Sequence, residues 1–149
     1  RKDGRLPVFE SNPLRLEIIP APENVAEKMK IMPGDPVIRC LRDMSDNGER
    51  TGVDVAYLDL ATFRDLKIED LEDVKGNLYK LYEEKLGVFI ADVTDILEFV
   101  IVDKEIQKIC DLPLGTPLFF VTRQSRLLNK KTVEIRYEYC SAVNYRLRI

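Results

Sequence analysis

The sequence predicts an α+β domain in which an antiparallel sheet carries flanking helices, and three features support this class. Runs rich in β-branched and aromatic residues, which are typical of strands, dominate the chain. Shorter stretches between them repeat apolar residues at helical spacing. One phrase also occurs twice: residues 32–42 and 112–123 each hold a glycine, a proline two positions later and an arginine six positions after that. This duplication predicts a pseudo-twofold internal repeat.

The first copy of the repeat is expected to contain a hairpin. An apolar run over residues 37–44 is followed by the pair Asn47 and Gly48, and both residue types tolerate the positive φ angles of a tight turn. Residues 52–58 then form the returning strand. A short amphipathic helix is expected just upstream of each copy of the phrase.

The second half alternates helices and strands in the same way. Asn77 and Gly87 are typical residues for the two ends of a helix, so a helix is expected between them. Residues 88–102 are rich in strand-forming residues but long for one strand, which predicts a bend or bulge at residues 92–95. Asp103 is a typical cap for a short helix that follows it. The remaining strands are expected at residues 118–127, 132–140 and 144–149.

Charged residues take matching positions when the two copies are aligned. Arg42 aligns with Arg123 near the end of the first strand of each copy, and Asp54 aligns with Glu134 on the returning strand. Because a hairpin buries only one face, two hairpins around a common sheet complete one core. The alternative is that Gly-x-Pro before an apolar run is ordinary turn chemistry.

Composition narrows the function. The chain has 149 residues, a net charge of −3 and a pI of about 5.2. This length suits one core of ordinary size, so residues 1–149 are expected to form one domain. The acidic charge provides no general basic field for nucleic acid. The sequence lacks both a signal-peptide pattern and an apolar run of about 18 residues, which supports neither export nor membrane insertion. The three cysteines form no CxxC pair, which is typical of reduced thiols in a cytoplasmic protein.

Histidine is absent from the sequence. Its absence removes the commonest general base, the usual nucleophilic triads and the commonest transition-metal ligand. The nucleotide-binding patterns GxGxxG, GxxxxGKS and GxxxxGKT are absent as well. The sequence therefore favours a binding function with no catalytic residue, no metal and no cofactor.

Charged residues of the two hairpins are the candidate binding groups. Arginine holds a carboxylate or phosphate with paired hydrogen bonds, and an ionised acid accepts from hydroxyls or amines. Arg42, Asp54, Arg123 and Glu134 are therefore expected to bind a small polar metabolite. The alternative is that Arg42 with Asp54, and Arg123 with Glu134, are cross-strand salt bridges on solvated faces.

The start of the helix after Asn77 adds a further candidate. A helix N-terminus presents free N–H groups that favour anions, so Asn77 as the cap and Tyr79 within the first turn would reach a ligand. The alternative is ordinary capping by Asn77, with Tyr79 packed on the sheet.

Four segments in order resemble one family: GDPVIRCLR, GNLYKLYEEKLGV, LPLGTPLFFVTR and VEIRYEYCSAVNYRL. They resemble the UTRA domain, the effector-binding half of HutC-type regulators in the GntR family of bacterial transcription factors, over residues 14–147. The resemblance implies a chorismate-lyase-like fold that binds a small metabolite, forms homodimers and has no catalytic activity. It also implies that operator DNA is bound only by an N-terminal winged-helix domain, which this chain does not contain.

The resemblance implies ligand contacts at Arg42, Asp54, Asn77, Tyr79, Glu134 and Tyr139. The chain departs from the family pattern at Cys40, where a second arginine often occurs, at Asn77, which replaces a serine, and at Cys140, which replaces a second tyrosine. These departures leave the ligand open between a sugar, a sugar phosphate and an amino-acid-derived metabolite. A chorismate-lyase-like enzyme and a protein-interaction domain also stay open as functions. We expect Arg42→Ala and Glu134→Ala to weaken binding and to leave the fold intact.

Overall fold

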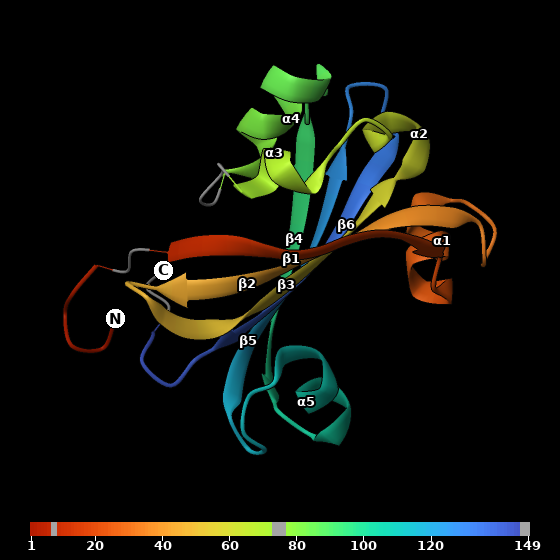
Figure 1. Ribbon diagram of the computed structural model, residues 1–149. Helices are drawn as coiled ribbons and strands as arrows, with labels where there is room; N and C mark the ends of the chain where they lie inside the picture. The colour runs from red at the N-terminus through yellow and green to blue at the C-terminus, as the bar shows by residue number, and fades with distance from the viewer. Residues whose placement is uncertain (7–8, 73–76, 147–149) are drawn as a thin grey trace.

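Six strands form one antiparallel sheet at the centre of the fold (Figure 1). The computed structural model describes residues 1–6, 9–72 and 77–146. The strands are β1 (Phe9–Pro20), β2 (Pro36–Asp46), β3 (Glu49–Asp59), β4 (Asp92–Ile101), β5 (Pro117–Arg126) and β6 (Thr132–Ser141). The helices are α1 (Glu23–Met29), α2 (Leu60–Phe63), α3 (Ile68–Glu72), α4 (Leu78–Leu86) and α5 (Lys104–Cys110). The predicted α+β class, an antiparallel sheet with flanking helices, is confirmed.

The strand order β1-β2-β3-β6-β5-β4 places two strand–helix–strand–strand units side by side. At their junction Ala56 of β3 lies opposite Arg136 of β6. Two residues away in either direction, on the same face of the sheet, the pairs are Asp54 with Glu138 and Leu58 with Glu134. Because Asp54 and Glu134 are matching positions of the two copies, this register has the symmetry of a twofold axis through Ala56 and Arg136. The predicted internal repeat is therefore confirmed, and each unit begins with a strand, β1 or β4, before its helix.

Turn and cap residues lie where the sequence predicts them. Asn47 and Gly48 connect β2 to β3 with φ angles of 51° and 84°, the positive values of a tight hairpin turn. The Asn77 side chain accepts a backbone hydrogen bond of 3.3 Å in the first turn of α4, and Gly87 ends that helix in the left-handed conformation. Asp103 caps α5 in the same manner as Asn77 caps α4.

Two predicted strand features are wrong. β4 begins at Asp92 and pairs with β5 in continuous register, so the irregularity expected at residues 92–95 is absent. Residues 144–146 do not form a strand, and residues 147–149 lie outside the described residues. β6 lies between β3 and β5, so the chain that leaves it finds no free sheet edge. Tyr145 instead donates a hydrogen bond to Asp46.

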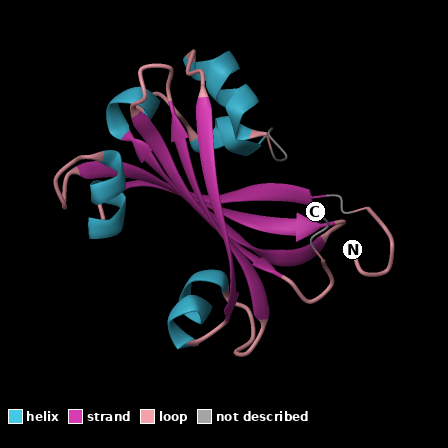
Figure 2. Ribbon diagram, turned by 180° about the vertical axis from the view of Figure 1, so that it is seen from behind, coloured by secondary structure: helices cyan, strands magenta, loops and turns pink. Residues whose placement is uncertain are grey.

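The two faces of the sheet carry different side chains, because successive residues of a strand point to opposite sides. We call the face with Arg42, Asp54, Glu134 and Arg136 the charged face, and the face with Tyr57, Phe120, Tyr137 and Tyr139 the aromatic face. Helices α2, α3 and α4 pack on the charged face against Cys40, Ala56 and Leu58. Helices α1 and α5 pack on the aromatic face. Figure 2 shows the twisted sheet from behind, with helices at its ends. Within the described ranges, none of the helices has the length and apolar character that spanning a membrane requires.

Gly52 lies on β3 at a point where the chain passes close to β6. A methyl group added there would stand 1.7 Å from the carbonyl oxygen of Tyr139, far inside van der Waals contact. Gly52→Ala is therefore expected to push the two central strands apart and to lower the free energy of unfolding by about 3 kcal/mol. Urea unfolding followed by circular dichroism measures this change, with Glu27→Ala at an exposed position of α1 as the control. Equal unfolding midpoints for the two variants would contradict the prediction.

Candidate functional site

A cavity of about 600 Å³ opens on the charged face. Every strand contributes to its lining, which consists of Phe9, Ser11, Arg42, Met44, Asp54, Asp95, Leu97, Phe119, Val121, Arg136, Glu138, Cys140 and Arg146. Pockets for small organic ligands usually measure about 300–1,000 Å³. The cavity is therefore of a suitable size for a small molecule.

The strand register separates the lining into a charged part and an apolar part. Residues that lie directly opposite one another in neighbouring strands form rows across the sheet. One row consists of Arg42, Asp54, Glu138, Val121 and Leu97. The next row consists of Met44, Gly52, Cys140, Phe119 and Phe99. A molecule in the cavity would therefore meet charged groups on one side and apolar side chains on the other.

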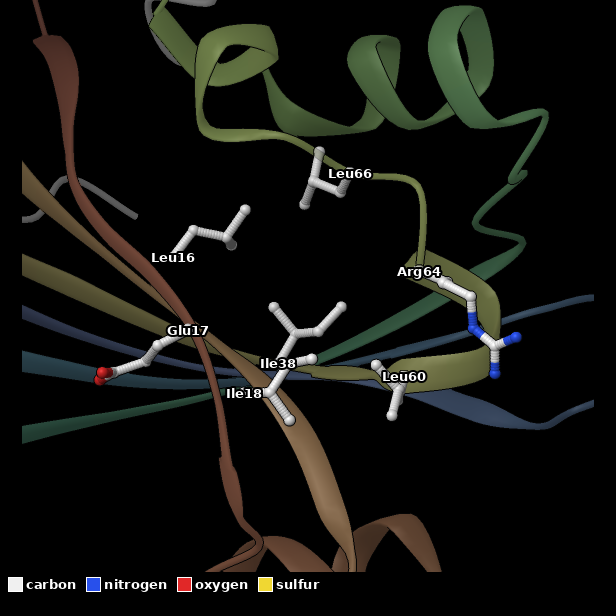
Figure 3. Close-up of a pocket in the computed structure, with 7 residues that line it drawn as sticks. All are labelled: Leu16, Glu17, Ile18, Ile38, Leu60, Arg64 and Leu66. Carbon is white, nitrogen blue, oxygen red and sulfur yellow. The ribbon is translucent and has the colours of Figure 1, made fainter.

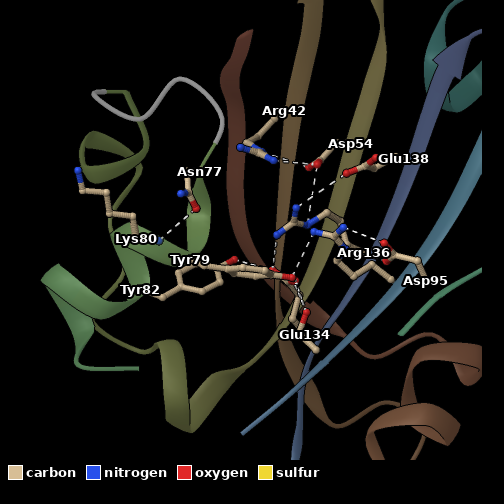
Figure 4. Close-up of polar contacts among 12 residues, drawn as sticks. Arg42, Asp54, Asn77, Tyr79, Lys80, Tyr82, Asp95, Glu134, Arg136 and Glu138 are labelled. Carbon is tan, nitrogen blue, oxygen red and sulfur yellow. Dashed lines mark hydrogen bonds and ion pairs between the residues drawn. The ribbon is translucent and has the colours of Figure 1, made fainter. Parts of the chain in front are cut away.

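Arg42 and Asp54 form a buried ion pair at the charged end of the first row (Figure 4). Arg42 donates from Nε to Asp54 Oδ1 at 3.1 Å and from Nη2 to Oδ2 at 2.8 Å. The two residues face each other across the hairpin of β2 and β3, which is why the pairing is two-pronged. The pair is thus a cross-strand salt bridge, which the sequence analysis gave as the alternative to ligand binding. It is not solvated, since Arg42 is 3% and Asp54 1% exposed.

Glu134 is fully buried and is held by groups from three directions (Figure 4). It accepts hydrogen bonds from Tyr82 Oη at 2.6 Å, Ser125 Oγ at 2.8 Å and Arg136 Nη2 at 2.9 Å. Burial alone would raise the pKa of Glu134, but the positive charge of Arg136 and these hydrogen bonds lower it below its ordinary value. Glu134 is therefore ionised, and its contacts connect α4 to the sheet.

Tyr79 lies beside this buried acid, whereas Asn77 remains a cap. The Tyr79 hydroxyl is 2.8 Å from Ser125 Oγ and donates to Glu134 at 3.3 Å. The guanidinium group of Arg136 stands 5.5 Å from the centre of the Tyr79 ring, within the range of a cation–π contact. Asn77 is exposed and caps α4. Capping by Asn77 and packing of Tyr79 on the sheet agree with the structural alternative from the sequence.

Arg123 pairs with Asp95 of β4. One alternative drawn from the sequence paired Arg123 with Glu134 instead, and the structure does not show that pair. Its Nε and Nη2 each donate to a carboxylate oxygen of Asp95 at 2.8 Å. The hydrogen bonds from Arg123 lower the pKa of Asp95 below its ordinary value. The register of the second hairpin explains the difference, because it puts Arg123 opposite Arg136 and Glu134 opposite Ser125.

Arg136 joins the buried charges, and sequence reasoning missed it. Besides its hydrogen bond to Glu134, its Nε lies 3.9 Å from Asp54 and its Nη1 lies 3.9 Å from Glu138. Burial would lower the pKa of Arg136, but Glu134 and Asp54 raise it well above its ordinary value, so the group stays charged. The alternation of charged residues at positions 134, 136 and 138 of one strand was the signal that could have identified it.

Three cavity residues have unused hydrogen-bonding capacity. Nη1 of Arg42 and Nε of Arg136 are buried and have no hydrogen-bond partner within the described ranges. The side chain of Glu138, which is 26% exposed, accepts no hydrogen bond from any described residue, and Arg136 is the cation paired with it at 3.9 Å. Burial, followed by the charge of Asp54, raises the pKa of Glu138. An unsatisfied donor or acceptor of this kind costs about 1–3 kcal/mol, which a ligand can recover.

Tyr139 does not belong to this cavity, and its placement with Arg42 in one site is wrong. It lies on the aromatic face, with its ring 4.9 Å from that of Phe120. Strand alternation explains this, because Tyr139 is an odd-numbered residue of β6 whereas Glu138 and Cys140 point into the cavity.

A second hollow of about 620 Å³ lies between β1, β2 and α2 (Figure 3). Its lining consists of Leu16, Glu17, Ile18, Ile38, Leu60, Arg64 and Leu66. It lacks a converging set of polar groups within the described residues. The cavity above Arg42 and Arg136 combines buried charged groups with apolar side chains, and we take it as the candidate site.

Comparison with known proteins places the chain in a family. The UTRA domain family model matches residues 8–146. The ligand-binding domain of a GntR-family transcriptional regulator from Bordetella bronchiseptica is 28% identical, with a TM-score of 0.83, and the match covers 95% of this chain and 88% of that one. YydK from Bacillus subtilis (16% identity, TM-score 0.80) and PhnF from Mycobacterium smegmatis (17%, 0.75) share the fold over 95% of this chain, which spans 62% of each. Since the family match extends over almost the whole sequence, this chain belongs to the UTRA domain family.

Proposed function

We propose that this chain is the effector-sensing domain of a GntR-type transcription regulator. In this proposal a small molecule binds in the cavity of the charged face and changes how a separate winged-helix domain binds operator DNA in the bacterial cytoplasm. The observation that carries the proposal is the 600 Å³ cavity, which is floored by Arg42 and Arg136, two buried arginines that each keep an N–H group without a partner in the described part of the chain. A ligand oxygen at such a group offsets the cost of burying it.

The regulatory step requires a difference in affinity. A ligand shifts an equilibrium only by as much as it favours one state over another, so the effector must bind one arrangement of the regulator more tightly. Arg136 supplies a physical connection, because it lines the cavity and donates a hydrogen bond to Glu134. Glu134 in turn accepts hydrogen bonds from Tyr79 and Tyr82 of α4. Ligand contact with Arg136 would therefore be felt in α4.

The DNA-binding part is proposed from length and family. The structures of YydK, which is described as a transcriptional regulator, and of PhnF are both longer than this chain. The chain spans 62% of each. We expect the genomic reading frame upstream of Arg1 to encode a winged-helix domain. A frame without one would contradict this part of the proposal.

The effector is proposed to be a small polar metabolite, with sugars and sugar phosphates among the candidates. A thermal-shift screen of bacterial metabolites with the 149-residue chain tests for it. A true effector is expected to raise the melting temperature and to shift the backbone amide NMR signals of Leu97, Phe119 and Glu138 more than those on the aromatic face. A screen without any hit would favour a protein-interaction domain.

Binding without turnover is the expected chemistry, since the chain has no histidine to act as a general base and its similar structures are regulatory domains. The alternative is an enzyme on the same scaffold that acts on chorismate. Incubation of the purified chain with chorismate distinguishes the two, because turnover would reject the regulatory proposal in its present form.

We also propose that the chain forms a homodimer through β4. This edge strand exposes apolar side chains on both faces, namely Val93, Ile96, Leu97, Phe99 and Ile101. An edge strand usually carries prolines, bulges or inward charges that prevent pairing with another chain. The opposite edge, β1, has Pro13 and a register shift beside it. β4 has neither.

A second copy of β4 suits this edge. Two copies can pair in antiparallel register about a twofold axis at Leu97, which satisfies free main-chain groups and continues the sheet. In this register the acids Asp95 and Glu98 lie opposite Phe99 and Ile96, so that no two acids face each other.

Ile96→Glu is expected to convert the dimer to a monomer. The new acid would lie opposite Glu98 of the partner subunit, and like charges directly opposite one another destabilise a sheet. Multi-angle light scattering after gel filtration measures the mass of each variant. Ile109→Glu on α5 makes the same change at an exposed position outside β4 and should stay dimeric. A wild-type chain that is monomeric at all concentrations would contradict the proposal.

A further inference from the structure

We propose that the effector is a primary amine with an apolar body, such as an apolar amino acid, and that Glu138 binds its ammonium group. This inference rests on the proposed function and names the class of ligand for the same cavity. Glu138 stands at the boundary between the charged and apolar parts, because it lies opposite Asp54 in β3 on one side and Val121 in β5 on the other.

Glu138 differs from the other carboxylates of the cavity. Asp54 receives two hydrogen bonds from Arg42, and Asp95 receives two from Arg123. Glu138 receives none from the residues that the structure describes, although its side chain is only 26% exposed. It is therefore the cavity carboxylate that lacks a donor within the described ranges.

No internal cation can serve Glu138 fully. Arg136 is nearest, with Nη1 at 3.9 Å, beyond hydrogen-bonding distance. Arg136 is already held by its 2.9 Å hydrogen bond to Glu134, which is fully buried. Any approach of Arg136 to Glu138 would weaken that contact. A full partner for Glu138 therefore comes from outside this network, and the partly exposed carboxylate is open to solvent or to a ligand.

An ammonium group fits Glu138 better than a hydroxyl does. Burial and the neighbouring charge of Asp54 both make the ionised form of Glu138 less favourable. The nearby arginines Arg136, Arg123 and Arg42 compensate the negative charge only in part, since the pKa of Glu138 is still raised. A sugar hydroxyl would donate a hydrogen bond without adding positive charge. A positively charged amine supplies both the hydrogen bond and the charge. The electrostatics of the site therefore select an amine.

The body of the ligand is apolar because of the side chains next to Glu138. Phe119, Val121 and Leu97 continue the lining from Glu138 towards β4, and Leu97 is 39% exposed. An apolar group placed there removes this surface from water. A sugar ring would instead leave hydroxyl groups against Phe119 and Leu97 without partners. The free N–H groups of Arg42 and Arg136 remain for a carboxylate or carbonyl oxygen of the same ligand.

Calorimetry with the 149-residue chain tests the class of ligand. We would compare matched sets that share a body: phenylalanine, 2-phenylethylamine and 3-phenylpropionate; leucine, isopentylamine and 4-methylpentanoate; tryptophan, tryptamine and indole-3-propionate. In the set with the best body, the amine-containing compounds are expected to bind about tenfold or more tightly than the acid without an amine. Glucose 6-phosphate serves as the sugar comparison and is expected to bind weakly.

Glu138→Gln locates the amine. The substitution keeps the shape of the side chain and removes its charge, so the amines are expected to bind about tenfold more weakly while the matched acids keep their affinity. Since no described residue donates to Glu138, the variant should fold, with a melting temperature at least as high as that of the wild type. Glu27→Gln makes the same change at an exposed position of α1, on the aromatic face of the sheet, and should leave binding unchanged.

The outcomes separate this inference from the proposed function. Binding of glucose 6-phosphate or of the acids alone, or amine binding that Glu138→Gln does not weaken, would overturn the inference and leave effector sensing in place. If none of these compounds binds but another metabolite of the screen does, the inference is likewise overturned and effector sensing stays in place. Failure of every compound, including the whole metabolite screen, would count against effector sensing itself.

Discussion

Replacing Glu134 by alanine is expected to lower the free energy of unfolding by about 3–5 kcal/mol. The substitution would leave the buried charge of Arg136 without its closest partner, and the hydroxyls of Tyr82 and Ser125 without their acceptor. Because Glu134 is fully buried, this result replaces the expectation from the sequence that Glu134→Ala leaves the fold intact. Urea unfolding followed by circular dichroism measures the loss.

Two controls make this prediction specific. Glu134→Gln retains an acceptor but not the charge, and should lose less stability than Glu134→Ala. Glu27→Ala removes an exposed acid of α1 and should change stability little. If Glu134→Ala and Glu27→Ala unfold at the same urea concentration, the buried network does not stabilise the chain.

The pH dependence of Glu134 has a definite sign. Its pKa in the folded chain lies below the ordinary value of 4.5. Its stabilising contribution is therefore fully present above pH 4.5 and is lost as the pH falls through the folded pKa. The stability difference between the wild type and Glu134→Gln should accordingly shrink on acidification below that value.

Arg42→Ala is the second large effect and is expected to cost about 3–5 kcal/mol, because it removes both hydrogen bonds to the buried Asp54 and leaves it only the more distant Arg136. A double-mutant cycle with Asp54→Ala measures how strongly the two residues depend on each other. The double variant should lose about 1–3 kcal/mol less than the sum of the single variants. Losses that simply add would show that the two side chains are not coupled, in contradiction to their two-pronged contact.

The sequence predicts much of the fold because local signals decide it. The turn at Asn47 and Gly48, the cap at Asn77 and the cap at Asp103 each depend on a single residue type with a specific backbone preference. β1 had no such signal, since Pro13 interrupts it and its alternation is irregular. Helices α2 and α3 are too short for periodicity to show.

The candidate site is less predictable because it depends on register. The two-residue turn pairs Asp46 with Glu49, and without interruption it would put Arg42 opposite Val53. A register shift between Met44 and Ser45, which the sequence does not announce, puts Arg42 opposite Asp54 instead. The second hairpin has a longer connection, and its register puts Ser125, not Arg123, opposite Glu134. The prediction that Tyr139 lies in the site failed for a related reason. One step along a strand moves a side chain to the other face of the sheet.

The twofold axis through Ala56 and Arg136 has a consequence for stoichiometry. A chain with fully matched halves would carry the same residue at both positions and would repeat the same lining on both sides of the axis. Here the axis has Ala56 on one strand and Arg136 on the other, so the duplication is broken at its own centre and one guanidinium group serves both halves. Titration of the chain should accordingly saturate at a single molar equivalent and not at two.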